Sequence, residues 1–105
     1  MKTKLLIMLI LVIGLSALSM TPEKHNVKPR DGYVPDETTA IAIAVAVWNP
    51  IYGKEKIQKE KPYNATLSNG VWRVTGSLPE RCIGGVAIAE ISKDDGKILR
   101  ISHGK

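Results

Sequence analysis

Few residues of this chain are of the types that carry out nucleophilic chemistry. The one cysteine is Cys82, and a reactive thiolate needs a histidine or another cation close by. The two histidines, His25 and His103, are both distant from Cys82 in the sequence. The sequence therefore favours Cys82 as a small buried apolar residue. A nucleophile and an intermolecular disulfide are the alternatives.

The other patterns that accompany catalysis are missing from the sequence. There is no metal-ligand spacing, no glycine-rich phosphate loop leading into a helix and no nucleophile elbow. Asp94 and Asp95 stand in the turn-like stretch KDDG, and the glycines of CIGGVA lead into a strand, where they indicate a bulge or a close backbone approach. We expect His103 to make a hydrogen bond near the C-terminus. The sequence therefore predicts no catalytic residue, no metal site and no cofactor. We expect that the protein is not an enzyme.

The N-terminal stretch MKTKLLIMLILVIGLSALSM has the form of a secretory signal peptide. Lys2 and Lys4 precede an apolar run within the usual ~7–15 residues, followed by small residues at 17 and 19. That run is shorter than the ~20 apolar residues of a membrane span. We predict a signal peptide over residues 1–19 and a periplasmic or secreted protein. In the alternative, the segment is retained as an inner-membrane anchor, and only then does the protein contact a membrane.

The charge balance argues against a nucleic-acid partner. The chain has 15 Lys and Arg against 10 Asp and Glu, a net charge of +5. Cleavage after Ser19 removes Lys2 and Lys4 and no acidic residue, which lowers the net charge to +3. The longest basic stretch, GKEKIQKEKP, includes interspersed glutamates, as on a solvated surface. We expect no binding of nucleic acid.

The rest of the chain divides into a linker and one small domain. Residues 20–32 are polar, contain prolines and lack hydrophobic periodicity, which predicts a flexible linker. Residues 33–105 contain no internal repeat and form a single domain of the size that buries only about 60% of its unfolded surface. The sequence does not indicate an oligomeric state.

The stretch PDETTAIAIAVAVWNPIYG predicts the helix of this domain. Acidic residues at 36 and 37 favour the start of a helix. Pro50 predicts a kink or a restart, with Asn49 as the cap of a short second helix. An apolar stripe follows at helical spacing and comprises Ile41, Ala44, Val45, Trp48 and Tyr52.

Two β-hairpins follow the helix. In PYNATLSNGVWRVTGSLP, a two-residue Asn69-Gly70 turn pairs Leu67 with Trp72 and turns both toward the helix. In GGVAIAEISKDDGKILRISHGK, a three-residue loop over residues 94–96, with Gly96 left-handed, pairs Ile91 with Leu99 and Glu90 with Arg100. The sequence thus predicts an α+β fold with one helix, kinked or followed by a short second turn, on a curved four-stranded antiparallel sheet.

One sheet face would cover the helix, and the other would be free for a partner. We expect this second face to be a shallow surface of apolar contacts with a charged rim, a plausible pattern for protein binding. Its predicted partner-binding residues are Arg73, Ile88, Glu90, Ile98 and Arg100. Simple outward exposure of the isoleucines is the alternative interpretation.

Three stretches together carry a resemblance to a known family. GYVPDETTAIAIAVAVWNPIYG, NGVWRVTGSLP and GGVAIAEISKDDGKILRISHGK resemble bacterial immunity proteins of the nuclear-transport-factor-2-like fold, which are associated with polymorphic toxin systems. The resemblance spans residues 32–105. The characteristic motifs are Ala-x-x-x-Trp-x-Pro-Ile-Tyr-Gly and the tail Gly-x-Ile-Leu-x-x-x-His-Gly-Lys.

The resemblance implies a helix in a curved sheet of nuclear-transport-factor-2-like or cystatin-like architecture. It also implies inhibition by binding and masking a cognate protein toxin, with no catalytic residues to carry over. The last hairpin is in addition similar to PepSY-type domains. That similarity leaves open an exported module that inhibits a peptidase or holds a small ligand under Trp48, Tyr52, Tyr63 and Trp72.

Overall fold

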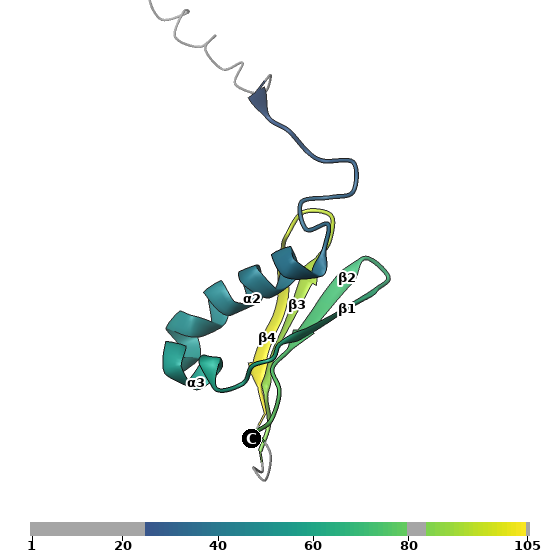
Figure 1. Cartoon of the computed structure of the whole chain (residues 1–105). Coiled ribbons are helices and arrows are strands. Elements are labelled where there is room, and N and C mark those ends of the chain that lie inside the picture. Colours follow the sequence, from purple (N-terminus) through teal and green to yellow (C-terminus); the bar gives the residue numbers. More distant parts are fainter. Residues whose placement is uncertain (1–24, 80–83, 105) are drawn as a thin grey trace, which may run out of the picture.

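The structure is a computed structural model that describes residues 25–79 and 84–104. Within these ranges, two helices precede four strands: α2 (Glu37–Tyr52), α3 (Lys54–Gln58), β1 (Asn64–Ser68), β2 (Val71–Thr75), β3 (Ala87–Ser92) and β4 (Ile98–His103). The strands form one antiparallel sheet in chain order, and both helices lie on the same side of it (Figure 1). The α+β fold predicted from the sequence is confirmed. The predicted signal peptide and Cys82 lie outside the described residues.

Helix α2 begins with a side-chain cap. The Asp36 Oδ1 accepts hydrogen bonds from the backbone N–H of Thr39 at 2.8 Å and from its hydroxyl at 2.7 Å. This satisfies one of the donors that every helix start leaves without a partner. Facing the sheet, α2 buries Ala40, Ala44 and Trp48, and the rest of the predicted stripe is partly buried.

The predicted short second helix is present as α3, but the first helix ends after Pro50, at Tyr52, so the predicted position of the restart is corrected. Helix α2 continues through Pro50 to Tyr52, and the chain turns at Gly53, whose φ of 102° favours glycine. Asn49 therefore does not cap α3, which has Gly53 as its N-cap and no side-chain cap. Proline is tolerated because it removes a single hydrogen bond near the helix end, and because its own ring points into solvent.

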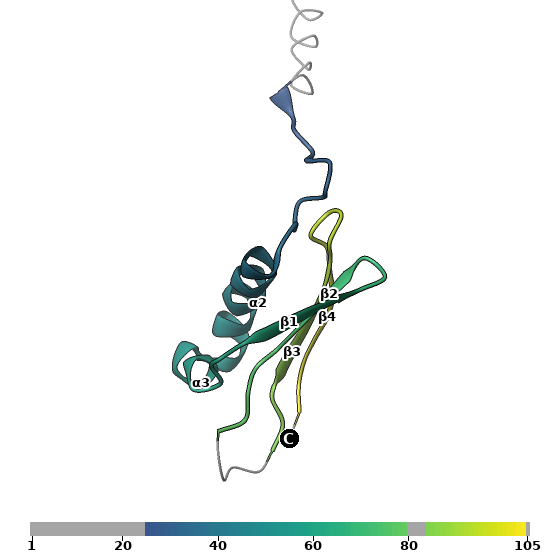
Figure 2. The same cartoon turned by 45° about the vertical axis from the view of Figure 1, so that its right-hand side comes forward.

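The first hairpin has the predicted register. Leu67 pairs with Trp72 and Ala65 with Val74 across the turn at Asn69 and Gly70, both of which have positive φ. This pairing places Leu67 on the same sheet face as Trp72, as predicted, but Leu67 does not join the core, since it is 45% exposed. The hairpin projects past the end of α2, which leaves its tip uncovered (Figure 2).

The second hairpin differs from its predicted register by one residue. Glu90 pairs with Arg100 and Ala89 with Ile101 as expected, but Ile91 pairs with Ile98 instead of Leu99. A bulge between Glu90 and Ile91 accounts for the shift, because two residues of β4 then face one residue of β3. Gly96 has the predicted left-handed conformation, with a φ of 77°.

The core lies between α2 and the sheet. Its largest fully buried side chains are Trp48, Ile57, Ile91, Val34 and Val74. The two indoles are hydrogen-bonded as well as buried: Trp72 Nε1 donates to the carbonyl of Val34 at 2.8 Å, and Trp48 Nε1 donates to the carbonyl of Ile88 at 3.3 Å. The four aromatic residues of the alternative ligand pocket thus contribute to the core.

The predicted linker is bound to the domain over its last residues. Tyr33 N–H donates to the carbonyl of Asp94 at 3.0 Å, and the Lys28 ammonium lies 2.8 Å from the Asp94 carboxylate. Gly32 is buried against the backbone of Lys93 and Asp94 with a φ of 88°, so no larger residue fits there. The chain therefore enters the domain beside the turn between β3 and β4, at the end of the sheet opposite the C-terminus (Figure 1).

Neither described helix combines the length and the apolar character that a membrane crossing requires.

Candidate functional site

The sheet face opposite the helices brings together three of the predicted site residues. β3 alternates between buried and half-buried positions, which directs Ala87, Ala89 and Ile91 to the core and Glu90 to the other side. The register places Arg73 of β2 and Arg100 of β4 on either side of Glu90. We call this surface the open face, since no described helix or strand covers it (Figure 2).

The three charged side chains form a ladder across the open face. Arg73 Nη1 donates to Glu90 Oε2 at 3.2 Å, and Arg100 Nη1 lies 3.8 Å from the same oxygen. Half-exposed ion pairs of this kind contribute little to stability, about 0–1 kcal/mol. Two guanidinium groups share one carboxylate, so the ladder keeps hydrogen-bond donors and one unit of positive charge for a partner.

The two predicted isoleucines lie in different places. Ile88 pairs with Thr75 and Ser102, has the same strand parity as Glu90, and therefore lies on the open face, half-buried. Ile98 pairs with buried Ile91 because of the bulge, so it does not have the predicted position beside the ladder. Its 37% exposure is at the edge strand β4. The predicted placement of Ile98 is thus corrected.

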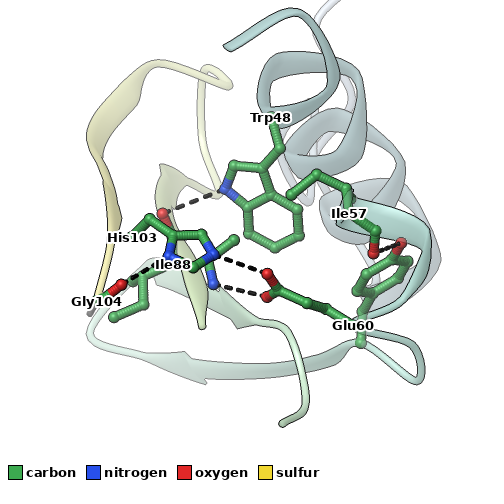
Figure 3. Close-up of polar contacts among 8 residues, drawn as sticks. Trp48, Ile57, Glu60, Ile88, His103 and Gly104 are labelled. Carbon is green, nitrogen blue, oxygen red and sulfur yellow. Dashed lines mark hydrogen bonds and ion pairs between the residues drawn. The ribbon is translucent and has the colours of Figure 1, made fainter. Parts of the chain in front are cut away.

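A second group of polar side chains, which sequence reasoning missed, lies at the C-terminal end of β4. Glu60 is only 6% exposed, and its Oε1 accepts a hydrogen bond from the backbone N–H of Ala87 at 2.8 Å. Its Oε2 lies 2.7 Å from His103 Nε2, and His103 Nδ1 lies 2.7 Å from the carbonyl oxygen of Gly104 (Figure 3). Glu60 comes from the stretch that was predicted to be a solvated surface, so that prediction is wrong for Glu60.

Local geometry leads the Glu60 side chain inward. The chain leaves α3 through a hydrogen bond from Glu60 N–H to the Ile57 carbonyl at 2.9 Å, and Ser77 N–H donates to the Glu60 carbonyl at 2.7 Å. Gly76 is buried against the Glu60 side chain, and a Cβ added there would lie 2.8 Å from the Glu60 Cβ. Only glycine at 76 leaves the space that Glu60 occupies.

This arrangement is suited to holding chain segments together and not to proton transfer. Each ring nitrogen of His103 already faces an oxygen, so neither is directed at a substrate. The Tyr63 hydroxyl donates to the carbonyl of Ile57 at 2.7 Å, and burial, followed by the negative charge of Glu60, raises the pKa of this phenol. Among the residues that the structure describes, no three His, Cys, Asp or Glu side chains gather as a metal site would need.

Beside the Glu60–His103 pair the surface is hollowed. The cleft encloses about 390 Å³, and its walls include Lys56 and Lys59 of the α3 region, Leu78 and Pro79, and Glu60 with His103. A smaller hollow of about 230 Å³ lies at the other end of the sheet, between Gly32, Gly70 and Asp94. The two hollows are separate features from the open face.

Comparison with known proteins identifies a family whose fold agrees with this architecture. A family model described as NTF2 fold immunity protein matches residues 39–105. In Escherichia coli K12, the chain is 37% identical over 73 residues to the uncharacterized protein YhhH, and 38% identical over 84 residues to the uncharacterized protein YbbC. These matches cover 69% and 79% of this chain but only 58% and 66% of the two relatives. No solved structure matches the chain.

Proposed function

The chain belongs to the family of NTF2 fold immunity proteins, and on this basis we propose that it is an exported protein that binds and neutralises a cognate toxin of a bacterial polymorphic toxin system. It acts in the periplasm and blocks the toxin sterically, without chemistry of its own. The observation that best supports a binding role is the open face, where a charged ladder lies on a sheet surface that no described element covers.

The open face has the composition that protein interfaces favour. Arginine is enriched among the residues that dominate binding energy, and here Arg73 and Arg100 lie on the two sides of Glu90. A stable complex buries about 800 Å² on each partner, a substantial part of a domain this small. We propose that Arg73, Glu90 and Arg100 provide the charged part of this interface and that Ile88 provides its apolar contact.

The test is co-purification of the tagged full chain with the product of the neighbouring gene, followed by a measurement of their Kd. The double variant Arg73→Glu, Arg100→Glu should weaken the complex at least about tenfold, since it replaces both guanidinium donors with like charge beside Glu90. Arg30→Glu, Lys97→Glu is the matched control, with the same change of net charge on exposed residues at the turn end of the sheet. Unchanged affinity in the first variant would exclude the open face. If the product of the neighbouring gene does not bind the wild-type chain, the proposal that it is the cognate toxin would be contradicted.

Export is proposed from the N-terminal sequence. Cleavage after Ser19 should give a protein that begins at Met20, and the intact mass of the chain recovered from a periplasmic extract measures this directly. A full-length mass in the membrane fraction would instead favour the anchored alternative.

A further inference from the structure

Four lysines lie within eight residues, at and just after α3. They are Lys54, Lys56, Lys59 and Lys61, and all four are exposed. Of the two glutamates in the same stretch, Glu55 is exposed, while Glu60 is turned inward and paired with His103. In the ranges 25–79 and 84–104, no carboxylate lies within salt-bridge distance of any of the four lysines.

Two of the four lysines line the cleft beside the Glu60–His103 pair. Lys56 and Lys59 line the cleft together with Glu60, whose carboxylate is bound by Ala87 N–H and His103. The Glu60 carboxylate is thus held by groups other than the lysines, and within the described residues no carboxylate pairs with Lys56 or Lys59. We call this site, with its lysines 56 and 59, the basic cleft.

The cleft also offers an apolar contact. Leu78 is 42% exposed and lies with Pro79 on the wall of the cleft. Exposed leucine beside lysine fits a polypeptide ligand, which brings apolar side chains together with its charges. A free inorganic anion has no apolar group that could contact Leu78.

We propose that the basic cleft binds an acidic segment of a protein partner, with carboxylates against Lys56 and Lys59 and an apolar side chain against Leu78. The inference rests on the proposed function in one respect, since it takes the toxin to be the source of this segment. Charge complementarity of this kind speeds encounter and selects among partners. The basic cleft would thus be a second contact region, distinct from the open face and beside α3, which lies on the helix side of the sheet (Figure 1).

The proposal can be tested without the toxin. The full chain is titrated with an oligoglutamate peptide that carries one leucine, and backbone amide shifts are followed by NMR. We expect saturable shifts at Lys56, Lys59 and His103, and a Kd that rises several-fold between about 50 mM and 300 mM salt. Lys56→Glu, Lys59→Glu should weaken binding at least about tenfold.

The matched control is again Arg30→Glu, Lys97→Glu, which makes the same change of net charge at the other end of the sheet. Equal weakening in the two variants would overturn the proposal, because net charge alone would then explain binding. Tighter binding of a single-stranded oligonucleotide than of the peptide at the same residues would also overturn it.

The outcomes for the cleft and for the proposed function are separable. A toxin complex that tolerates Lys56→Glu, Lys59→Glu but not Arg73→Glu, Arg100→Glu would support the proposed function and refute the cleft as a toxin contact. Peptide binding that depends on the lysines, in a chain that binds no toxin, would support the cleft and contradict the proposed function.

Discussion

Glu60 connects three parts of the chain that are distant in sequence. Its carboxylate binds the start of β3 through Ala87 N–H and the end of β4 through His103, and its backbone carbonyl accepts a hydrogen bond from Ser77 N–H. Both side-chain contacts are shielded from water, since the Glu60 side chain is 8% exposed and the His103 side chain is 14% exposed. Loss of the carboxylate would therefore leave buried donors without acceptors.

We predict that Glu60→Ala lowers the free energy of unfolding by roughly 3–5 kcal/mol, the usual effect of removing one member of a buried pair. Urea denaturation followed by circular dichroism measures the change. Glu55→Ala is the control, an exposed glutamate in the same stretch, and should change stability by less than about 0.5 kcal/mol. Equal stability of the two variants would mean that the Glu60–His103 contact does not hold the fold together.

Sequence reasoning could not find the Glu60–His103 pair for a physical reason. The two residues are 43 positions apart, and each has a local context that predicts exposure: a lysine-rich stretch for Glu60 and a chain end for His103. Only the packed sheet brings them together. One signal was available, since Gly76 leaves room for a large neighbour, but nothing in the sequence identified that neighbour as Glu60.

At the scale of elements, the start of α2 depends on a single cap. The side-chain hydroxyl of Thr39, followed by its backbone N–H, lowers the pKa of Asp36 below its usual 3.8. A carboxyl whose pKa is lower in the folded state stabilises that state above the unfolded pKa. This contribution is lost as the pH falls through the folded pKa.

Asp36→Ala should accordingly lower the melting temperature at neutral pH by roughly 4–8 °C, the range expected for loss of a cap in a domain of this size. Asp36→Asn keeps an acceptor for Thr39 but cannot titrate. It should therefore lose less stability than wild type as the pH falls from about 5 through the lowered pKa of Asp36. Melting curves across this pH range measure both effects. Parallel pH profiles for wild type and Asp36→Asn would contradict the role of the Asp36 charge.

Pro50 gives a second prediction at this scale. It lies inside α2, where proline removes a hydrogen bond and its ring crowds the preceding turn, and it is exposed, so it adds little packing. Pro50→Ala should therefore raise the free energy of unfolding by about 1–3 kcal/mol, measured by urea denaturation. Ala46→Ser, at another exposed position of α2, should lower it slightly. Destabilisation by Pro50→Ala would mean that proline fixes the junction with α3.

The two hairpins show how far sequence determines register. In the first, the Asn69-Gly70 turn and the alternation around Trp72 agree on one pairing, and the structure has it. In the second, two loop lengths were considered and the three-residue loop was preferred, but neither includes the bulge that pairs Ile91 with Ile98. The ladder of Arg73, Glu90 and Arg100 was nevertheless predictable, because the shift begins beyond Glu90.

At the scale of the whole molecule, the anchored N-terminal segment and the basic cleft lie at opposite ends of the sheet. Residues 28–34 bind the turn between β3 and β4, and the chain before them leaves the domain there (Figure 2). Any tether at the N-terminus would therefore direct α3 and the C-terminal end of β4 away from its attachment point. The open face and the basic cleft would both stay accessible to a partner.

The last prediction concerns how these two surfaces act in one complex. The open face and the basic cleft lie on opposite sides of the sheet and share no residue, so their contributions to the free energy of binding should add. For the triple variant Arg73→Glu, Lys56→Glu, Lys59→Glu, we expect the fold-increase in Kd for the toxin to be a product of two factors. One is the fold-increase of the single variant Arg73→Glu, and the other is that of the double variant Lys56→Glu, Lys59→Glu. Calorimetric titration at one salt concentration measures all three variants against wild type, with Arg30→Glu, Lys97→Glu as the charge control. A combined effect no larger than that of Arg73→Glu alone would confine the interface to the open face, because independent contacts cannot substitute for each other.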